Sequence, residues 1–123
     1  MSYQLITIVG YLGADAETQR LADGTPVTNF SVAVNKRFTN AQGDKVQRTT
    51  WFNVALWGER GVTLAGHLTK GTLVLVAGEV SAEAYPDEKT GKPLGSLKLT
   101  AGRVQLLSPK PDEPLINDEP YQE

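Results

Sequence analysis

Cysteine is absent from this 123-residue chain, and histidine occurs once. Without thiols the chain has no disulfide, thiolate metal site or thiol nucleophile, so its stability must come from its core and its interfaces. The single histidine, His67, has no second imidazole with which to complete a metal site. Nucleophile-elbow, His-Glu helix and P-loop motifs are also missing. We therefore expect no cofactor and no enzymatic activity.

Long apolar runs are missing too. No signal-type or transit-type segment precedes the alternating pattern that starts at the N-terminus, and no stretch is apolar enough to span a bilayer. The composition, 40% hydrophobic and 21% charged, is that of an ordinary soluble globular protein. We expect a cytoplasmic protein without membrane contact, which also agrees with the reducing compartment that a cysteine-free chain suits.

The charges are segregated along the chain, although their formal sum is only −2. Residues 1–110 carry all 12 lysines and arginines against nine acids, whereas residues 111–123 carry five acids and no cation. A mildly basic body suits the binding of a polyanion. Prolines and acids after Ser108 leave few apolar residues to anchor that segment. We expect one folded domain over residues 1–108 and a disordered acidic tail over residues 109–123.

Period-two alternation and β-branched residues predict five strands, over residues 5–9, 27–35, 46–57, 73–80 and 96–107. The first strand is expected to be mostly buried and to turn at Gly10 and Gly13. Polar, turn-forming tips join the second strand to the third and the fourth to the fifth. These pairs of strands should therefore form two extended hairpins.

Residues 59–69 differ from the strands, because Val62, Ala65 and Leu68 follow a helical spacing. The helix is expected to stop at Lys70 and Gly71. Three strands, one helix and two strands is the layout of the five-stranded oligonucleotide-binding barrel, or OB-fold, in which the helix plugs one end. A β-sandwich usually has more strands and no such helix. We therefore expect an all-β, Greek-key OB barrel.

The two tryptophans lie on one predicted strand. Trp51 and Trp57 are six residues apart, so in an unbulged strand both indoles point to the same face. Their parity is that of the polar positions, whereas Phe52, like Phe30 in the preceding strand, falls among aliphatic positions. We expect the indoles to face outward as a stacking platform for bases and the two phenylalanines to lie in the core. The alternative is that the candidate stacking rings also simply fill the core.

Several segments resemble the bacterial and mitochondrial single-stranded DNA-binding protein family, over nearly all of the first 107 residues. Each segment is short, but their order and spacing together are specific. The segments are IVGYLGAD at residues 8–15, VTNFSVAV at 27–34, TTWFNVALWG at 49–58, LTKGTLV at 68–74 and GEV at 78–80. The resemblance implies a nucleoid-associated protein that binds and protects single-stranded DNA, without marked sequence specificity, during replication, recombination and repair.

The resemblance also implies four base-stacking positions, which are Phe38, Trp51, Trp57 and Tyr85. Candidate phosphate contacts are the cations around the first hairpin and the helix and on the second hairpin: Lys36, Arg37, Lys45, Arg48, Arg60, Lys70, Lys89, Lys92 and Lys98. Each of them could equally be a solvated surface charge. The chain departs from the family at Glu59, Glu83 and Ala84, where relatives often carry cations.

Partners follow from the resemblance as well. It implies a homotetramer, with Phe52 and the strand around residues 3–9 as expected interface elements. The acidic end, NDEPYQE at residues 117–123, loosely matches the tip through which family members recruit replication and repair proteins. Two alternatives stay open: an OB-fold protein that binds RNA or serves as a primosome or replication-restart accessory, and a structural oligomerisation module with buried aromatic residues.

Overall fold

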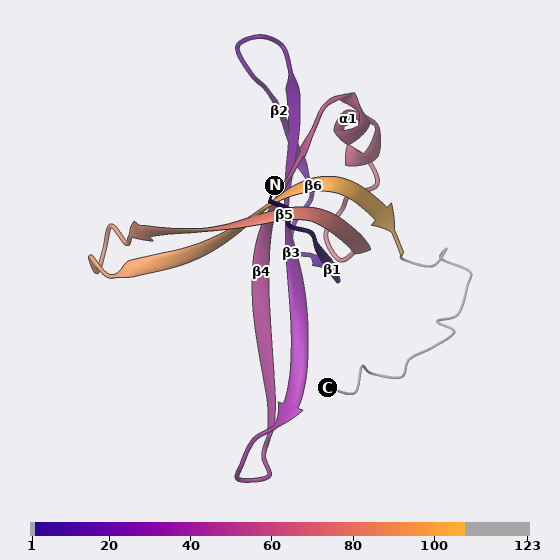
Figure 1. Ribbon diagram of the computed structural model, residues 1–123. Coiled ribbons are helices and arrows are strands. Elements are labelled where there is room, and N and C mark those ends of the chain that lie inside the picture. The colour runs from indigo at the N-terminus through magenta and orange to yellow at the C-terminus, as the bar shows by residue number, and fades with distance from the viewer. Residues whose placement is uncertain (1, 108–123) are drawn as a thin grey trace.

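The computed structural model of the chain describes residues 2–107, apart from the side chains of Tyr85, Pro93 and Leu94. The predicted tail, residues 109–123, lies outside the described residues. In chain order the elements are the strands and helix drawn in Figure 1: β1 (Ile6–Leu12), β2 (Glu17–Arg20), β3 (Pro26–Thr39), β4 (Lys45–Trp57), α1 (Glu59–Ala65), β5 (Leu73–Pro86) and β6 (Pro93–Leu106).

Five of these strands close into a barrel. β1 pairs with β3 and β5, β5 pairs with β6, β6 pairs with β4, and β4 pairs with β3. All of these pairs are antiparallel except β4 and β6, which run parallel. A five-stranded closed sheet with one helix between the third and fourth barrel strands is the OB-fold. The predicted fold class is therefore confirmed.

The core fills the barrel interior with the inward-facing residues of each strand. Phe30 and Phe52 are only 6% and 7% exposed, so both predicted core phenylalanines are confirmed. Around them lie the aliphatic side chains Ile8, Leu12, Val32, Val54, Leu56, Leu68, Val74, Val76 and Leu99. Because Phe52 is buried within a single chain, it offers almost no surface to a partner, and its expected role at an interface was wrong.

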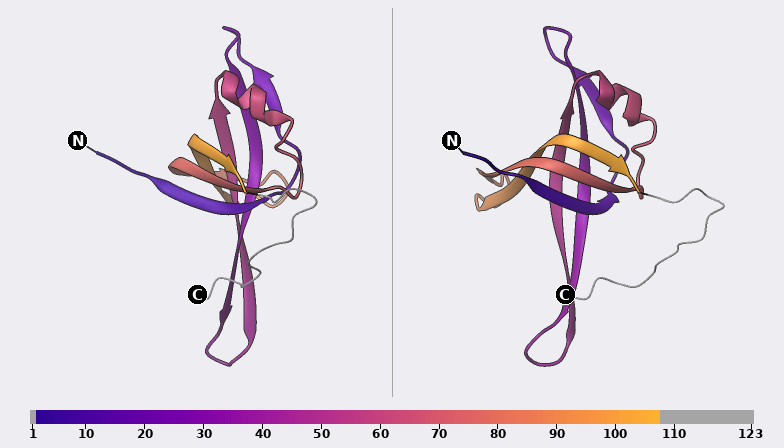
Figure 2. Two further views of the ribbon diagram at one scale, coloured as in Figure 1. Left: turned by 90° about the vertical axis from the view of Figure 1, so that its right-hand side faces the viewer. Right: turned by 45° about the vertical axis from the view of Figure 1, so that its right-hand side comes forward.

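Two hairpins extend from the barrel as arms (Figures 1 and 2). The arm of β3 and β4 stays paired out to Thr39 and Lys45, and the arm of β5 and β6 out to Pro86 and Pro93. Beyond the barrel the strands have no core to cover, so the alternation of apolar and polar residues weakens there. The strands predicted from that alternation were therefore too short. The views agree that the two arms point in different directions.

The first strand differs from its prediction. β1 continues through Gly10 to Leu12, and its residues alternate between buried and exposed instead of being mostly buried. A Cβ at Gly10 would lie 2.2 Å from the carbonyl oxygen of Ala33, so only glycine lets β1 pass this close to β3. This glycine therefore marks the crossing that closes the barrel, not a turn.

A further strand, β2, was not predicted. All four of its residues are exposed, so no apolar alternation marks it, yet it pairs with β3 from Pro26 to Asn29. In the turn that follows, the backbone N–H of Thr25 donates to the Asp23 carboxylate at 2.9 Å and holds the pKa of that group below its ordinary value. β2 thus adds one short strand to the sheet at the edge of β3, from Pro26 to Asn29.

The helix is shorter than expected. α1 ends at Ala65, and the amides of His67 and Leu68 reach back only three residues, to Leu64 and Ala65. Leu68 is fully buried although it lies beyond the helix, while Val62 is 37% exposed. Gly71 has a φ of 87° and forms the turn before β5. Within residues 2–107 no helix is long and apolar enough to cross a bilayer.

Candidate nucleic-acid interface

Trp51 and Trp57 lie on the outer face of β4, as their parity predicts. They are 49% and 48% exposed, and the residues opposite them on β3 are Ala33 and Val27, which are buried. Each indole therefore covers a small or aliphatic neighbour with part of its surface and presents the rest to solvent. Six strand positions separate the two rings by about 20 Å.

Small and polar side chains form the floor between the two indoles. One row across the sheet pairs Asn29 with Ala55 and Ala55 with Thr100, and the next row pairs Ser31 with Asn53 and Asn53 with Lys98. Paired residues on neighbouring strands point to the same face of a sheet. A planar base can therefore lie close to this floor. The amides and hydroxyls of the floor can both donate and accept hydrogen bonds.

These residues line a groove of about 540 Å³ that contains Trp57. Its walls differ in charge, with Asp15 and Glu17 on one side and Lys98 on the other. Lys98 forms a salt bridge with Glu83 at 3.1 Å, and the Asn53 amide donates to the Ser96 hydroxyl at 2.9 Å. An aromatic wall, a flat polar floor and an open side are the features that stacked, unpaired bases require.

The Trp51 ring rests on Gly13, in the turn after β1. A Cβ placed on Gly13 would lie 2.6 Å from Cζ3 and 2.7 Å from Cη2 of the indole. The absence of a side chain at this position therefore lets the ring lie against the backbone. The packing fixes one part of the indole and leaves its exposed part available for contact with a base.

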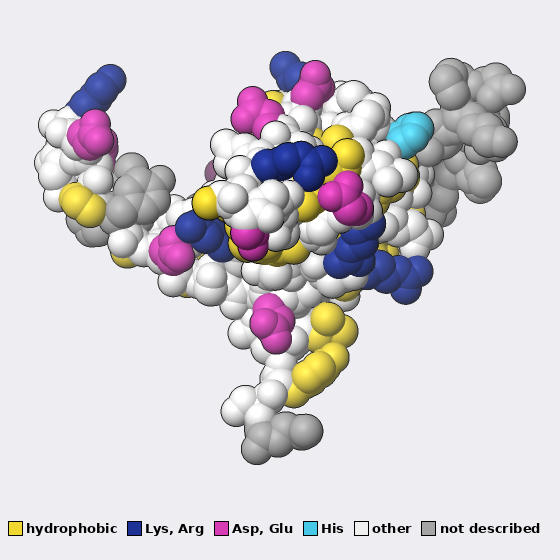
Figure 3. Space-filling model, turned by 90° about the horizontal axis from the view of Figure 1, so that it is seen from above, with side chains coloured by type: hydrophobic (Ala, Val, Ile, Leu, Met, Phe, Trp, Pro, Cys, Tyr) yellow, Lys and Arg dark blue, Asp and Glu magenta, His cyan; other side chains and the backbone are white. Residues whose placement is uncertain are grey.

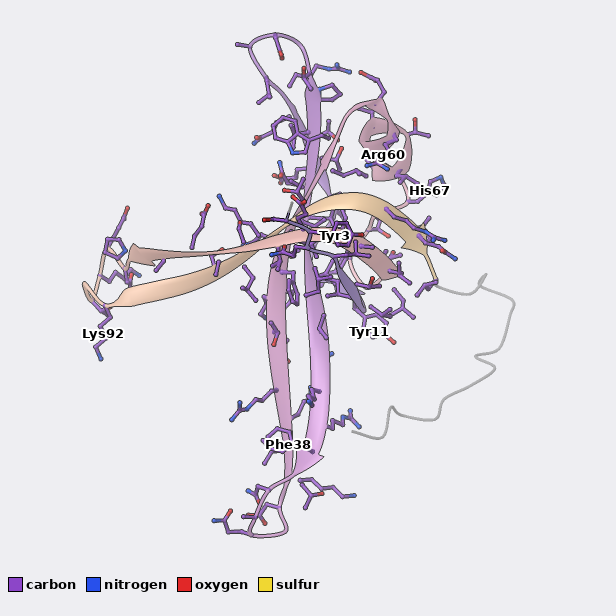
Figure 4. The ribbon with its side chains drawn as sticks, viewed as in Figure 1. Tyr3, Tyr11, Phe38, Arg60, His67 and Lys92 are labelled. Carbon is purple, nitrogen blue, oxygen red and sulfur yellow. The ribbon has the colours of Figure 1, made fainter. Side chains whose placement is uncertain are left out.

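The β3–β4 arm carries Phe38 close to its tip (Figure 4). The Arg48 guanidinium lies over the Phe38 ring, with Cζ 5.5 Å from the ring centroid. At this distance a cation and an aromatic face attract one another. Arg48 thus covers one face of Phe38 and holds a positive charge beside the ring, where the phosphate of a nucleotide stacked on the ring can be bound.

The same arm has an excess of cations. Lys36 and Arg48 are directly opposite one another in the register, and like charges in that position repel. Among residues 2–107 the two salt bridges join Arg20 to Glu59 and Lys98 to Glu83, so none of the arm's cations is in an ion pair there. The cations are Lys36, Arg37, Lys45 and Arg48. A phosphate between them would relieve this repulsion.

Other predicted site residues are dispersed. Arg60 lies in the first turn of α1, and its guanidinium donates to the carbonyl oxygens of Gly102, at 2.6 Å, and Ala101, at 3.2 Å. Lys70 lies in the turn before β5, and Lys92 lies at the tip of the β5–β6 arm. Figure 4 shows Phe38, Arg60 and Lys92 in three separate parts of the molecule. The engagement of Arg60 with β6 gives it a structural role.

Tyr85 lies in β5 opposite Leu94, and its side chain is outside the described part of the chain. Its predicted stacking role stays a prediction. The backbone places it on the second arm, beyond Glu83. A strand that contacted Tyr85 and Phe38 together would therefore have to reach both arms.

Sequence reasoning did not identify several residues of the groove. Asn29, Ser31 and Thr100 are polar residues on strands, and only their parity relative to the core marks them as outward-facing. Gly13 was assigned to a turn and not to the support of Trp51. The strand parity of these polar residues could have predicted that they form the floor. The contact between Gly13 and Trp51 could not be predicted in this way, because it depends on how the barrel closes.

At the end of the molecule that carries β2 and α1, neither positive nor negative side chains predominate. Figure 3, seen from above, shows acidic and basic side chains interspersed there. Within residues 2–107 no group of three or more metal-ligating side chains comes together. The basic arm and the aromatic groove are therefore the features of the described surface that suit a polyanion with flat bases.

The closed barrel, the helix between its third and fourth strands and the outward aromatic groove define an OB-fold protein with a surface for an extended strand. The profile of the Single-strand binding protein family matches residues 3–107. The chain belongs to this family.

Related proteins share much of the chain. It is 29% identical over 105 residues to Single-stranded DNA-binding protein 1 of Chlorobaculum tepidum, covering 85% of this chain and 65% of that protein. It is 34% identical over 103 residues to the Single-stranded DNA-binding protein of Aquifex aeolicus, covering 84% of this chain and 69% of that protein. The matched segment thus spans about two thirds of the length of these relatives.

Solved structures share the fold. The Plasmodium falciparum SSB in complex with ssDNA superimposes with a TM-score of 0.73 at 20% identity, covering 88% of this chain and 97% of that chain. The small single-stranded DNA-binding protein from Streptomyces coelicolor gives a TM-score of 0.71 at 23% identity, covering 86% and 95%. At these identities the likeness establishes the shared OB architecture.

Proposed function

We propose that this protein binds single-stranded DNA through the groove beside Trp57, the exposed ring of Trp51 and the cationic β3–β4 arm. Bound DNA would be protected during replication, recombination and repair. The half-exposure of two indoles on the outer face of one strand carries the proposal most directly, because a protein that only needed a core would bury them. Membership of the Single-strand binding protein family supports it.

Binding without marked sequence specificity follows from the chemistry of the groove. Every base has a π-face, so stacking on indoles is tolerant of sequence, and each stack contributes about 1–3 kcal/mol. The arm cations contact phosphates, which are the same in every nucleotide. Phe38, with Arg48 on one face, extends this surface along the arm.

Fluorescence anisotropy of labelled oligonucleotides tests the proposal. Oligo-dT should bind more tightly than a DNA duplex, because unpaired bases are required for stacking. It should also bind more tightly than oligo-rU, because the methyl group of thymine adds apolar surface to each stack. Equal or tighter binding of oligo-rU would favour an RNA-binding or replication-restart function instead. If no oligonucleotide binds, the aromatic surface serves a structural role and the proposal is wrong.

We further propose that the protein assembles as a homotetramer through β1. Four of the five alternate residues from position 3 to position 11, all except Thr7, are apolar and exposed: Tyr3 83%, Leu5 59%, Val9 37% and Tyr11 50%. Within the described part of the chain, β1 meets β3 only at Tyr11 and Leu12, so its edge from Ile6 to Gly10 carries no second strand. An apolar face beside an open strand edge suits pairing with another copy.

The predicted acidic tail would recruit replication and repair proteins. This proposal depends on the charge segregation of the sequence, in which residues 111–123 carry five acids and no cation. Deletion of the residues after Lys110 should abolish binding of such partners while oligo-dT binding persists. Unchanged affinity for the partner proteins after deletion would overturn it.

A further inference from the structure

One salt bridge of the described residues borders the proposed DNA-binding groove. Lys98 lines the groove together with Trp57, and its ammonium lies 3.1 Å from the carboxylate of Glu83. The cation of the other salt bridge, which joins Arg20 to Glu59, does not line this groove. Among the residues described for the groove, Lys98 is the one cation. Glu83 therefore neutralises the positive charge that the groove itself offers to a phosphate.

The register of β5 and β6 fixes the position of this ion pair. Glu83 is opposite Ser96, and Ser81 is opposite Lys98, so the two charged residues are diagonal neighbours on one face of the sheet. On the other side of β6, Asn53 is in register with Lys98, and its amide donates to the Ser96 hydroxyl at 2.9 Å. The carboxylate is thus held where the floor of the groove meets the β5–β6 arm.

The ion pair is open to exchange. The side chains of Lys98 and Glu83 are 57% and 50% exposed, and an exposed pair of this kind contributes little to stability. A phosphate offers the ammonium anionic oxygens like those of the carboxylate, so it can take the place of Glu83. The displaced carboxylate nevertheless stays attached to β5 beside the phosphate, and the two like charges repel one another.

We infer that Glu83 is a tethered competitor of DNA phosphate at Lys98, and that it lowers both the affinity for single-stranded DNA and the salt dependence of binding. A lysine that neutralises a phosphate releases counterions from the DNA, which contributes about 0.7 to the slope of log K against log salt. A lysine whose charge is already balanced by a fixed carboxylate contributes less. This inference rests on the proposed binding of single-stranded DNA and concerns how strongly the groove holds the phosphates.

Glu83→Gln tests the inference, because it removes the charge and keeps the size of an exposed side chain. Affinities for oligo-dT are measured by anisotropy at several salt concentrations for the wild type and the variant. The variant should bind about threefold more tightly at low salt, an effect of the size expected for an exposed charge pair. The slope of log K against log salt should become steeper by up to about 0.7, because Lys98 is free to neutralise a phosphate.

The same substitution in a Lys98→Ala background distinguishes competition from general repulsion. Without the ammonium, removal of the carboxylate frees no cation, so the slope should change much less than in the Lys98 protein. Equal steepening in both backgrounds would overturn the inference, because Glu83 would then act only by repelling the DNA.

The matched control is Glu88→Gln, which makes the same charge change in the turn at the end of the β5–β6 arm, away from Lys98. It should leave the slope close to the wild-type value, and a shift equal to that of Glu83→Gln would also overturn the inference. If the wild type binds oligo-dT and Glu83→Gln changes neither affinity nor slope, the inference is wrong while the binding function stands. Failure of the wild type to bind oligo-dT would overturn the proposed function and this inference with it.

Discussion

At the scale of single residues, the contact between Gly13 and Trp51 links the fold to the proposed site. The indole is supported by a glycine that has no side chain, so its orientation depends on a residue outside the strand that carries the ring. The outward direction of Trp51 and Trp57 could be predicted from parity alone. The support by Gly13 could not, because it joins residues 38 positions apart and depends on barrel closure.

Gly13→Ala should weaken oligo-dT binding while the barrel stays folded. The new Cβ would lie 2.6 Å from Cζ3 of Trp51, so the ring must leave its position, and a part of one stack, which contributes about 1–3 kcal/mol, is lost. Anisotropy titration measures the affinity, and circular dichroism checks the fold. Gly66→Ala is the control, because a Cβ at that position meets no atom within 4 Å. Equal affinities of the two variants would contradict the role of Gly13.

At the scale of the elements, the two arms differ in charge. The part of the β3–β4 arm from residue 35 to residue 49 has four cations and one acid, whereas residues 81–98 of the other arm have three of each. The sequence revealed both hairpins through their turn-forming tips. It did not reveal β2, because a fully exposed strand has no apolar alternation. The early end of α1 was also missed, since Leu68 is buried from a turn and not from a helix.

Removing one arm cation should reduce the salt dependence of binding. In Lys36→Ala and in Arg48→Ala, the slope of log K against log salt should fall in magnitude by about 0.7, the value for one phosphate contact on a single strand. Titrations with oligo-dT at several salt concentrations give the slope. Lys92→Ala, at the tip of the neutral arm, provides the comparison and should change it less. Identical slopes for all three variants would contradict a DNA path along the β3–β4 arm.

Arg60→Ala should act on stability instead of on DNA binding. The guanidinium joins α1 to β6 through the carbonyl oxygens of Gly102 and Ala101, and loss of these partly exposed hydrogen bonds should lower the free energy of unfolding by about 1 kcal/mol. Urea denaturation measures this change. A wild-type midpoint combined with a reduced salt slope would instead assign Arg60 to the phosphate contacts.

At the scale of the whole molecule, the apolar face of β1 sets the expectation for assembly. Light scattering should give four times the chain mass of 13.3 kDa for the wild type. The double variant Leu5→Lys/Val9→Lys should be smaller, because two charges are placed on the exposed face. Leu21→Lys alters an exposed leucine away from β1 and should leave the mass unchanged. A wild-type mass of one chain would contradict the tetramer.

Length, charge segregation and strand order predicted the general form of the molecule, a basic barrel domain with two hairpins. The assembly of chains was harder to predict from the sequence, because the pattern of residues does not say whether an outward apolar side chain meets solvent or another chain. Phe52 illustrates this point: it was expected at an interface from the family resemblance, and closure of the barrel placed it in the core at 7% exposure.

The stacking of bases on Trp51 and Trp57 is tested most directly by two single-tryptophan proteins, Trp57→Phe and Trp51→Phe. Each retains one indole and a phenyl ring in place of the other, so the emission of each reports on one position. Addition of oligo-dT to saturation should quench the fluorescence of both proteins, because a base lies against each indole. Unchanged emission from either protein, with DNA binding established by anisotropy, would contradict stacking at that position.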